Sequence, residues 1–282
     1  MSSVPQRTIR RAVSVSGTGI HTGARAEITC RPAPVDEGIV FVRPDHPASP
    51  MRASLHNVTG THRGITLGAG SASVRTVEHL LAAAAGLGIT NLLVDVRGEE
   101  LPILDGSAAP YCALLSRAEI AEQAGTIEPI TPRGAAWVEE GEATLLAVAG
   151  PYLRITYVVP LRHAALGAAQ VADITVRDGV FMRDIAPART WGFAADVEKL
   201  RRQGLATGAS LDNALGIGPE GYLNPPRMSN EPVRHKILDL IGDLALLGRP
   251  LLAHVIAVGA GHALHLKLVR RLEREADTAR EP

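Results

Sequence analysis

The 282-residue sequence contains few cysteines and few aromatic residues. Two cysteines, Cys30 and Cys112, cannot supply a disulfide framework or a cysteine-rich zinc site, so we expect a reducing compartment. Aromatic residues account for only 3% of the chain, so alanine, valine, isoleucine and leucine must fill the core. Cys112 falls in an amphipathic pattern and is expected to belong to that core.

The sequence also lacks an excess of charge of either sign. Lysine and arginine number 29, and aspartate and glutamate number 29, so the formal net charge is zero. Proteins that bind the phosphate backbone of nucleic acids usually carry a basic excess. The charge balance therefore argues against a nucleic-acid partner.

No hydrophobic run is long enough to cross a membrane. The most apolar stretches, 80–96 and 244–258, are both interrupted by glycine or polar residues, and neither reaches the roughly 20 residues that a transmembrane helix needs. Residues 1–15 contain no apolar segment typical of a signal peptide. We therefore expect a cytoplasmic protein without a transmembrane segment.

Hydrophobic residues make up 46% of the chain and charged residues 21%, which is typical of a globular protein. Patterning in the first half predicts strands over 8–16, 25–31, 38–43 and 91–96 and helices over 76–85 and 107–123. After a proline-rich break at 124–133, it predicts strands over 134–138, 143–149, 153–159, 170–176 and 252–258 and helices over 194–203, 231–247 and 262–276. Both halves share this order, which predicts two α+β domains of similar design.

The predicted helix over 231–247 carries a polar stripe. At about 100° per residue, Asp239 and Asp243 lie within about 80° of His235, and Lys236 lies about 100° from it. The stripe becomes apolar near the end of the helix, which indicates partial burial. A buried carboxylate needs a cation, a metal ion or hydrogen bonds, and His and Asp four residues apart can bind one metal ion. A solvated polar face is the alternative interpretation.

Three further positions are candidates for chemistry. Glu78 and His79 point about 100° apart on a helix, so one could bind a metal ion while the other accepts a proton from a metal-bound water. His262 follows a glycine-rich turn at a strand end, where it could enter a cleft. Thr190 could donate one hydrogen bond. Solvent-exposed or half-buried side chains without function remain the alternative for each.

Seven segments in a fixed order carry a resemblance that spans about residue 6 to about residue 272. They are QRTIRRAVSVSGTGIHTG (6–23), TVEHLLAAAAGLGITNLLVDV (76–96), ELPILDGSAAPY (100–111), ARTWGF (188–193), GLATGASLDNA (204–214), VRHKILDLIGDL (233–244) and GHALHLKL (261–268). In sequence, order and spacing they resemble the zinc-dependent UDP-3-O-acyl-N-acetylglucosamine deacetylases of lipid A biosynthesis, the LpxC family.

The resemblance implies an α+β fold of two similar domains, 1–126 and 127–282. Each would pack a β-sheet against two helices, as a β-α-α-β sandwich, with the active site between the domains. It also implies that His79, His235 and Asp239 are ligands of a zinc ion. Such a ligand set leaves a fourth tetrahedral position for water, whose pKa zinc lowers toward about 7.

The resemblance further implies the catalytic roles. Glu78 would act as general base on the water, and the resulting hydroxide would attack the acetamide carbonyl. Thr190 would donate a hydrogen bond to the oxyanion, and His262, oriented by Asp243, would protonate the leaving amine. The products would be acetate and UDP-3-O-acyl-glucosamine, in the committed step of lipid A biosynthesis.

Other residues of the family pattern concern the substrate. Lys236 and Trp191 are implied to contact it, and an insert around 192–223 would form the passage for its acyl chain. Trp191 replaces the usual Phe, Gly259 stands where many members carry a basic residue, and His265-Leu266 replaces a common polar pair. A zinc amidohydrolase with a shifted substrate and a non-catalytic binding relative are the alternative functions.

We expect one small-molecule partner, the acylated UDP-amino sugar. The acyl chain would allow a transient contact with a membrane surface. We expect a monomer.

Overall fold

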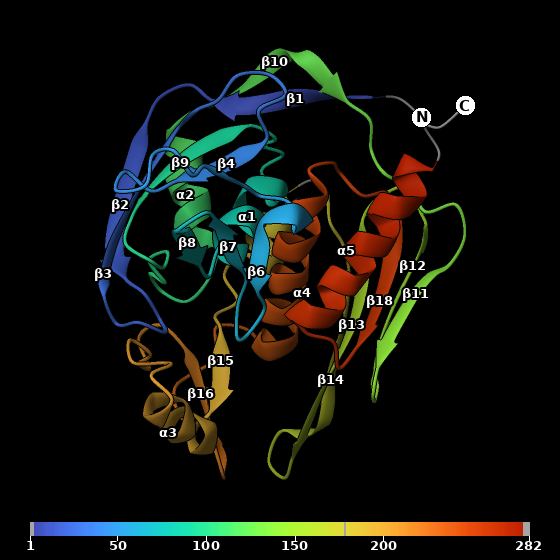
Figure 1. The fold of residues 1–282 in the computed structure, drawn as a ribbon. Helices are drawn as coiled ribbons and strands as arrows, with labels where there is room; N and C mark the ends of the chain where they lie inside the picture. Colours follow the sequence, from blue (N-terminus) through green and yellow to red (C-terminus); the bar gives the residue numbers. More distant parts are fainter. Residues whose placement is uncertain (1–2, 178, 279–282) are drawn as a thin grey trace.

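The computed structural model describes residues 3–177 and 179–278, and its N-terminal half forms a five-stranded sheet (Figure 1). The strand order is β2-β3-β9-β4-β5. The strands are β2 (Val13–Thr18), β3 (Arg25–Pro32), β4 (Ile39–Val42), β5 (Met51–Arg52) and β9 (Leu92–Arg97). Alternate residues of β3 and β9 are buried, so one face of the sheet packs against the core. The helices α1 (Glu78–Gly86) and α2 (Ala109–Arg117) belong to this half.

The C-terminal half builds a second five-stranded sheet in the order β11-β12-β18-β13-β14. Its strands are β11 (Ala136–Glu140), β12 (Ala143–Ala149), β13 (Arg154–His163), β14 (Gly167–Thr175) and β18 (Ala253–Val258). Two long helices contact this sheet, α4 (Glu231–Leu244) and α5 (His262–Asp277). The apolar face of α5 includes Leu264, Leu268 and Leu272, which are buried.

The two sheets have the same topology. In each sheet one inner pair is parallel, β9 with β4 and β18 with β13. The other pairs, from edge to edge, are antiparallel. The predicted fold class, two similar arrangements of sheet and helices, is therefore confirmed.

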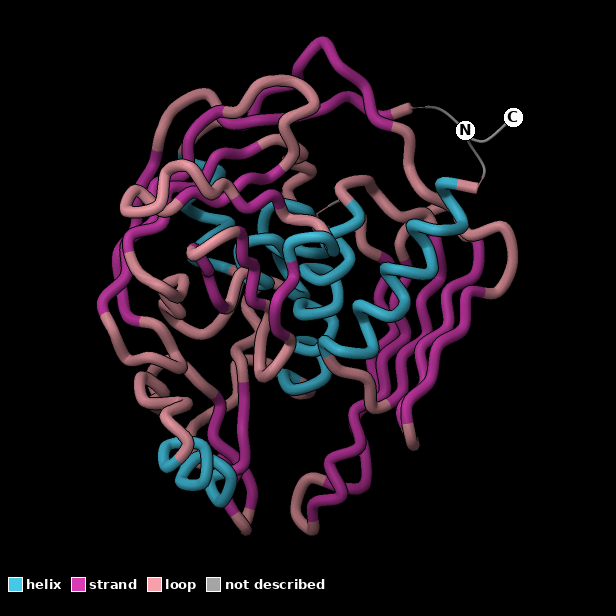
Figure 2. Tube along the Cα trace, in the orientation of Figure 1, coloured by secondary structure: helices cyan, strands magenta, loops and turns pink. Residues whose placement is uncertain are grey.

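The helices form a central layer between the sheets. Figure 2 shows the two five-stranded sheets on the outside and the helices, apart from the small α3 (Ala194–Arg202), between them. At the centre α1 packs against α4. Gly242 permits this contact, because a Cβ there would lie 2.2 Å from the backbone oxygen of Glu78. The polar stripe of α4 therefore lies beside the first turn of α1.

Smaller elements complete the fold. A three-stranded sheet consists of β6 (Val58–Gly60), β7 (Thr66–Ala69) and β8 (Ala72–Arg75), and a second consists of β15 (Trp191–Phe193), β16 (Leu215–Gly218) and β17 (Gly221–Tyr222). The strand β1 (Val4–Ile9) pairs with β10 (Ile120–Ile127). The short helices are η1 (Leu55–Asn57), η2 (Phe181–Ile185) and η3 (Ala245–Leu247), of which η3 continues α4.

The predicted helix over 107–123 is wrong beyond Arg117. Glu119 adopts a positive φ of 59°, which ends the helix. The next eight residues then form β10, whose exposed and half-buried residues mostly alternate. The predicted strand over 8–16 is likewise interrupted, by a bend at Arg10 and Arg11, and forms parts of β1 and β2. The remaining predicted strands and helices are confirmed, with shifts of a few residues at their ends.

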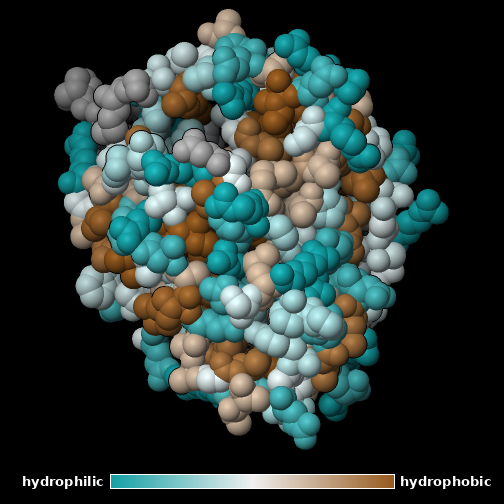
Figure 3. All heavy atoms as spheres, turned by 180° about the vertical axis from the view of Figure 1, so that it is seen from behind, coloured by the Kyte–Doolittle hydropathy of each residue, from teal (hydrophilic) through white to brown (hydrophobic). Residues whose placement is uncertain are grey.

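Both cysteines are free and buried, and burial raises the pKa of each thiol to about 12. The expectation that Cys112 belongs to the core is confirmed. Among the described residues, we find no helix with the length and apolar character required to cross a bilayer. Figure 3 shows polar and apolar residues interspersed on the face opposite to that of Figure 1.

Candidate active site

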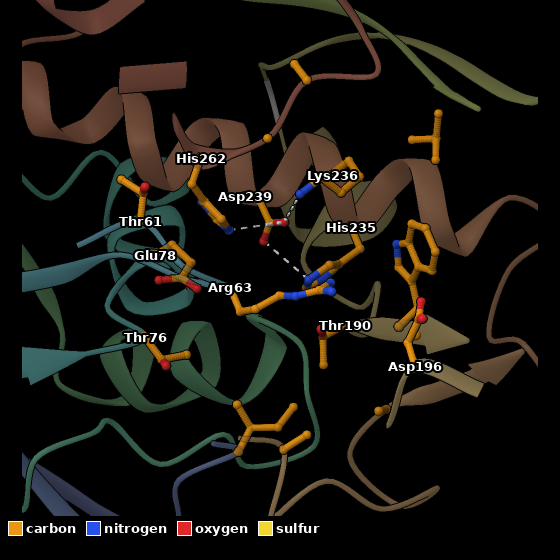
Figure 4. Close-up of a pocket in the computed structure, with 18 of the residues that line it drawn as sticks. Thr61, Arg63, Thr76, Glu78, Thr190, Asp196, His235, Lys236, Asp239 and His262 are labelled. Carbon is orange, nitrogen blue, oxygen red and sulfur yellow. Dashed lines mark hydrogen bonds and ion pairs between the residues drawn. The ribbon is translucent and has the colours of Figure 1, made fainter. Parts of the chain in front are cut away.

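A cavity of about 700 Å³ lies where the two halves meet. Its lining includes the first turn of α1, the middle of α4, the start of α5 and the segment around β15. Figure 4 shows the polar side chains that these elements point into it. The cavity thus combines residues that lie far apart in the sequence.

Three buried side chains in the cavity form a potential metal site. Donor atoms of His79, His235 and Asp239 all lie within 4.8 Å of one another. Oδ1 of Asp239 is 3.2 Å from Nε2 of His235 and 3.8 Å from Nε2 of His79. Tetrahedral zinc with bonds of about 2.0–2.2 Å holds its ligand atoms about 3.3–3.5 Å apart. The donor types and their spacing therefore fit a zinc ion.

The two histidines are in the form that binds metals. Burial lowers the pKa of His79 to about 3 and also lowers the pKa of His235, so both rings are neutral. Nδ1 of His235 lies 3.1 Å from the backbone oxygen of Ala188. Because that oxygen can only accept, Nδ1 carries the hydrogen and Nε2 keeps its lone pair for the cavity.

Asp239 is the electrostatic centre of the site. In Figure 4 the dashed lines from His235, Lys236 and His262 converge on it. Burial opposes its ionisation, but His235 and Lys236 hold the pKa of its carboxyl well below the usual value. Nζ of Lys236 lies 2.7 Å from Oδ2 of Asp239. Asp239 is therefore anionic, and Lys236 is paired with it inside the cavity.

Glu78 opens α1 and is buried beside the potential metal site. Its Oε2 accepts a hydrogen bond of 3.0 Å from the backbone N–H of Ile65. Gly64, at a φ of 156°, makes room for the carboxyl, because a Cβ there would lie 2.8 Å from Oε1 of Glu78. Burial raises the pKa of Glu78 to about 7. A carboxyl in this range can both take up and release a proton near neutral pH.

His262 lies at the start of α5 and points into the cavity on the same side as Glu78 (Figure 4). Its Nδ1 is 2.7 Å from Oδ2 of Asp243, and its Nε2 is 3.9 Å from Oδ2 of Asp239. Burial lowers the pKa of His262, but the Asp243 carboxylate more than offsets this and raises it to about 9. His262 is therefore an imidazolium that can donate a proton from Nε2.

Thr190 and Trp191 lie at the start of β15, and both line the cavity. The backbone N–H of Thr190 bonds to Gly106, and the indole N–H of Trp191 donates to the backbone oxygen of Pro232 over 3.1 Å. The Thr190 hydroxyl makes no hydrogen bond within the described part of the chain, so it can donate one to a ligand in the cavity. The predicted insert around 192–223 contains α3 and β16, and Val197 and Leu200 of α3 also line the cavity.

The structure brings all nine predicted site residues to one place, with Asp243 behind His262. It also adds residues to which the sequence assigned no role in the site. His265 contacts Asp243, and its signal was the three-residue spacing from His262. Arg63 lines the cavity with a positive φ of 62°, and no local pattern in the sequence marked it.

Comparison with known proteins agrees with this geometry. A family model described as LpxC, UDP-3-O-acyl N-acetylglycosamine deacetylase, matches residues 6–274. A protein of Myxococcus xanthus named UDP-3-O-acyl-N-acetylglucosamine deacetylase is 45% identical over 275 residues, which cover 96% of this chain and 87% of the relative. Proteins of the same name from Thermosynechococcus vestitus and Trichormus variabilis are 42% and 40% identical, over 96% and 95% of this chain and 94% and 98% of the relatives.

Proposed function

The chain belongs to the LpxC family, and from this premise we propose that His79, His235 and Asp239 hold a zinc ion at which an acetamide is hydrolysed. The protein is a metalloenzyme that deacetylates UDP-3-O-acyl-N-acetylglucosamine in lipid A biosynthesis. The observation that carries the proposed site is the convergence of three buried donors, from α1 and α4, within 4.8 Å.

The bound ion would supply a Lewis acid for the amide carbonyl and would lower the pKa of a water molecule at its open position. The Glu78 carboxylate takes a proton from the attacking water. The Thr190 hydroxyl donates a hydrogen bond to the carbonyl oxygen as negative charge develops there. Nε2 of His262 gives its proton to the departing nitrogen, so that water and the amide become acetate and a free amine.

Asp243 and Lys236 have supporting roles in the proposed mechanism. Asp243 keeps His262 charged and oriented by accepting the hydrogen bond that Nδ1 of His262 donates. Lys236 and Trp191 would contact the substrate from the cavity wall. The segment 192–223 would accept the acyl chain, because Val197 and Leu200 form an apolar part of the lining.

The wider organisation remains part of the proposal. We propose domains 1–126 and 127–282, each contributing one side of the cavity. A cytoplasmic location, a monomeric state and a transient contact of the acyl chain with a membrane surface also stay predictions.

A deacetylation assay tests the substrate directly. The purified protein is given UDP-3-O-acyl-N-acetylglucosamine or, in parallel, UDP-N-acetylglucosamine without the acyl chain. We expect acetate release from the first and far slower release from the second. Equal rates on both would favour an amidohydrolase with a shifted substrate, and no release from either would contradict the proposed function.

The metal is tested separately. The protein is purified without air and its zinc and iron are quantified per chain. We expect about one zinc per chain from the three-ligand set. Finding one iron per chain instead would support the three-ligand site but contradict zinc as its ion.

A further inference from the structure

One buried histidine of the site has no part in the mechanism above. His265 lies one turn after His262 on α5, and its side chain is 0% exposed. It does not line the cavity, so it cannot contact the substrate. We propose that His265 is a positioning residue, which holds the Asp243 carboxylate in the orientation that His262 requires. This inference rests on the proposed function, in which His262 is the proton donor.

Two imidazoles share one carboxylate oxygen. Oδ2 of Asp243 lies 2.7 Å from Nδ1 of His262 and 2.7 Å from Nδ1 of His265. Because the ionised carboxylate can only accept, both nitrogens carry a hydrogen and both rings donate. Oδ1 of Asp243 is buried and has no hydrogen-bond partner among the described residues. The orientation of the carboxylate therefore depends on the two bonds to Oδ2.

The far side of the His265 ring packs against Tyr157, with the two rings edge to face and their centroids 6.1 Å apart. Nε2 of His265 lies 3.1 Å from the hydroxyl of Tyr157 on β13, and the same hydroxyl donates to the backbone oxygen of Ala260 over 2.7 Å. Tyr157 is itself buried. Ala260 precedes His262 by two residues, so Tyr157 connects the His265 ring to the turn that presents His262. The chain of contacts runs from β13 through His265 to Asp243.

The geometry has a consequence for proton donation. A carboxylate held by one hydrogen bond can rotate about its Cβ–Cγ bond and carry the His262 ring with it. A second donor at a fixed position removes that freedom. The position of His262 matters because misplacing a reacting group by about 1 Å can lower the rate by about a hundredfold. His265 thus acts on the reaction only through Asp243.

Two substitutions of His265 distinguish a role in positioning Asp243 from a role in filling the core. His265→Leu keeps an apolar side chain of similar size and removes both ring nitrogens. His265→Asn places an amide nitrogen on Cγ, where Nδ1 of histidine is attached, and so keeps a donor for Asp243. We expect His265→Leu to lower kcat by about tenfold with little change in KM, and His265→Asn to keep most of the wild-type kcat. A residue that only fills the core would favour leucine over asparagine.

The matched control is His254→Asn. His254 lies on β18, where its Nε2 contacts the Thr156 hydroxyl at 2.8 Å, and it is absent from the cavity lining. We expect this variant to keep the wild-type kcat. His262→Ala, measured beside it, should lose most of the activity.

Proton NMR of the metal-loaded protein gives a readout that needs no substrate. The Nδ1–H of His262, bonded to a carboxylate, should resonate far downfield and vanish in His262→Ala. We expect this signal to persist in His265→Asn and to shift or broaden in His265→Leu. An unchanged signal and unchanged kcat in His265→Leu would overturn the inference, as would equal losses in both variants. If His265→Leu did not fold, the test would rest on His265→Asn, for which the inference predicts that the signal persists and that most of the wild-type kcat is kept.

These readouts also separate the two proposals. If the wild-type protein released no acetate, the proposed function would fail, while the imidazole signal would still report whether His265 orders the Asp243–His262 pair. If the wild type and His262→Ala behaved as proposed and His265→Leu matched the wild type, only the inference about His265 would fail.

Discussion

Gly242 and Glu78 lie in direct contact where α4 crosses α1, and a Cβ on Gly242 would come within 2.2 Å of the Glu78 backbone oxygen. This crossing brings His79 of α1 to His235 and Asp239 of α4. Three donors from two halves of the chain therefore share one position only because a glycine lets the two backbones approach. The packing of the helices and the proposed metal site depend on the same contact.

Gly242→Ala should therefore damage both stability and metal binding. The added methyl group must push α4 away from α1, which we expect to cost about 1–3 kcal/mol of the free energy of unfolding. Urea unfolding and zinc content per chain measure the two effects. Gly134→Ala is the control, because a Cβ there meets nothing within 4 Å. Equal stability and zinc content in the two variants would contradict this account of the crossing.

Substitutions at His235 and Glu78 should separate metal binding from proton transfer. His235→Ala removes a proposed ligand and should lower zinc content and activity together. Glu78→Gln removes only the proton acceptor, so zinc content should stay at the wild-type level while kcat falls by about 10²–10⁴-fold. Zinc analysis and acetate release on the same preparations provide the comparison. Loss of zinc in both variants, or in neither, would contradict the separate roles.

Gly64→Ala should affect the reaction through the Glu78 carboxyl. A Cβ at Gly64 would lie 2.8 Å from Oε1 of Glu78, and the φ of 156° is one that alanine rarely adopts. The carboxyl or its loop must move, so we expect kcat to fall by about tenfold or more while zinc stays bound. Gly134→Ala is again the control. A variant with wild-type kcat would show that the position of this carboxyl does not limit the reaction.

Acid should weaken the contact that ties α4 to the segment carrying Thr190. The buried Glu231 of α4 accepts hydrogen bonds from the backbone N–H of Arg189 and Arg227 and from the Arg189 side chain. Burial opposes its ionisation, but these bonds hold the pKa of the Glu231 carboxyl below its usual value. Its stabilising contribution is therefore complete above the unfolded pKa of about 4.3 and is lost as pH falls through the lower folded pKa.

The measurement is urea unfolding of the wild type and Glu231→Gln across this pH range. At about pH 7 the variant should be less stable by about 3 kcal/mol or more, because the Arg189 charge is left buried without its partner. The difference should shrink as pH falls below about 4. A difference that stayed constant with pH would contradict a stabilising role for the ionised carboxylate.

Local patterns in the sequence predicted the helices that carry the chemistry. The spacing of His235 and Asp239, followed by apolar residues near the helix end, indicated a partly buried polar stripe on α4. The structure confirms this burial for His235, Asp239 and Asp243. The contact between α1 and α4 joins residues about 160 positions apart, and no local periodicity reports such a contact. That residues of these two helices meet in one site followed only from the resemblance to a family.

Other features escaped sequence analysis for physical reasons. The strands β6 to β8 are only three or four residues long, and β6 and β7 contain glycine, so they give little alternation to detect. The strand β10 follows directly on α2 and was included in the predicted helix, because a single residue, Glu119, changes the backbone direction through its positive φ. His265 at the third position after His262 looks like a core residue until its contact with Asp243 is known.

Diffraction data collected at the zinc absorption edge would test the central claim most directly. We predict one anomalous peak per chain, at about 2.0–2.2 Å from Nε2 of His79, Nε2 of His235 and a carboxylate oxygen of Asp239. A zinc-replete crystal with no peak there, or with its peak on other residues, would contradict the proposed metal site and the mechanism built on it.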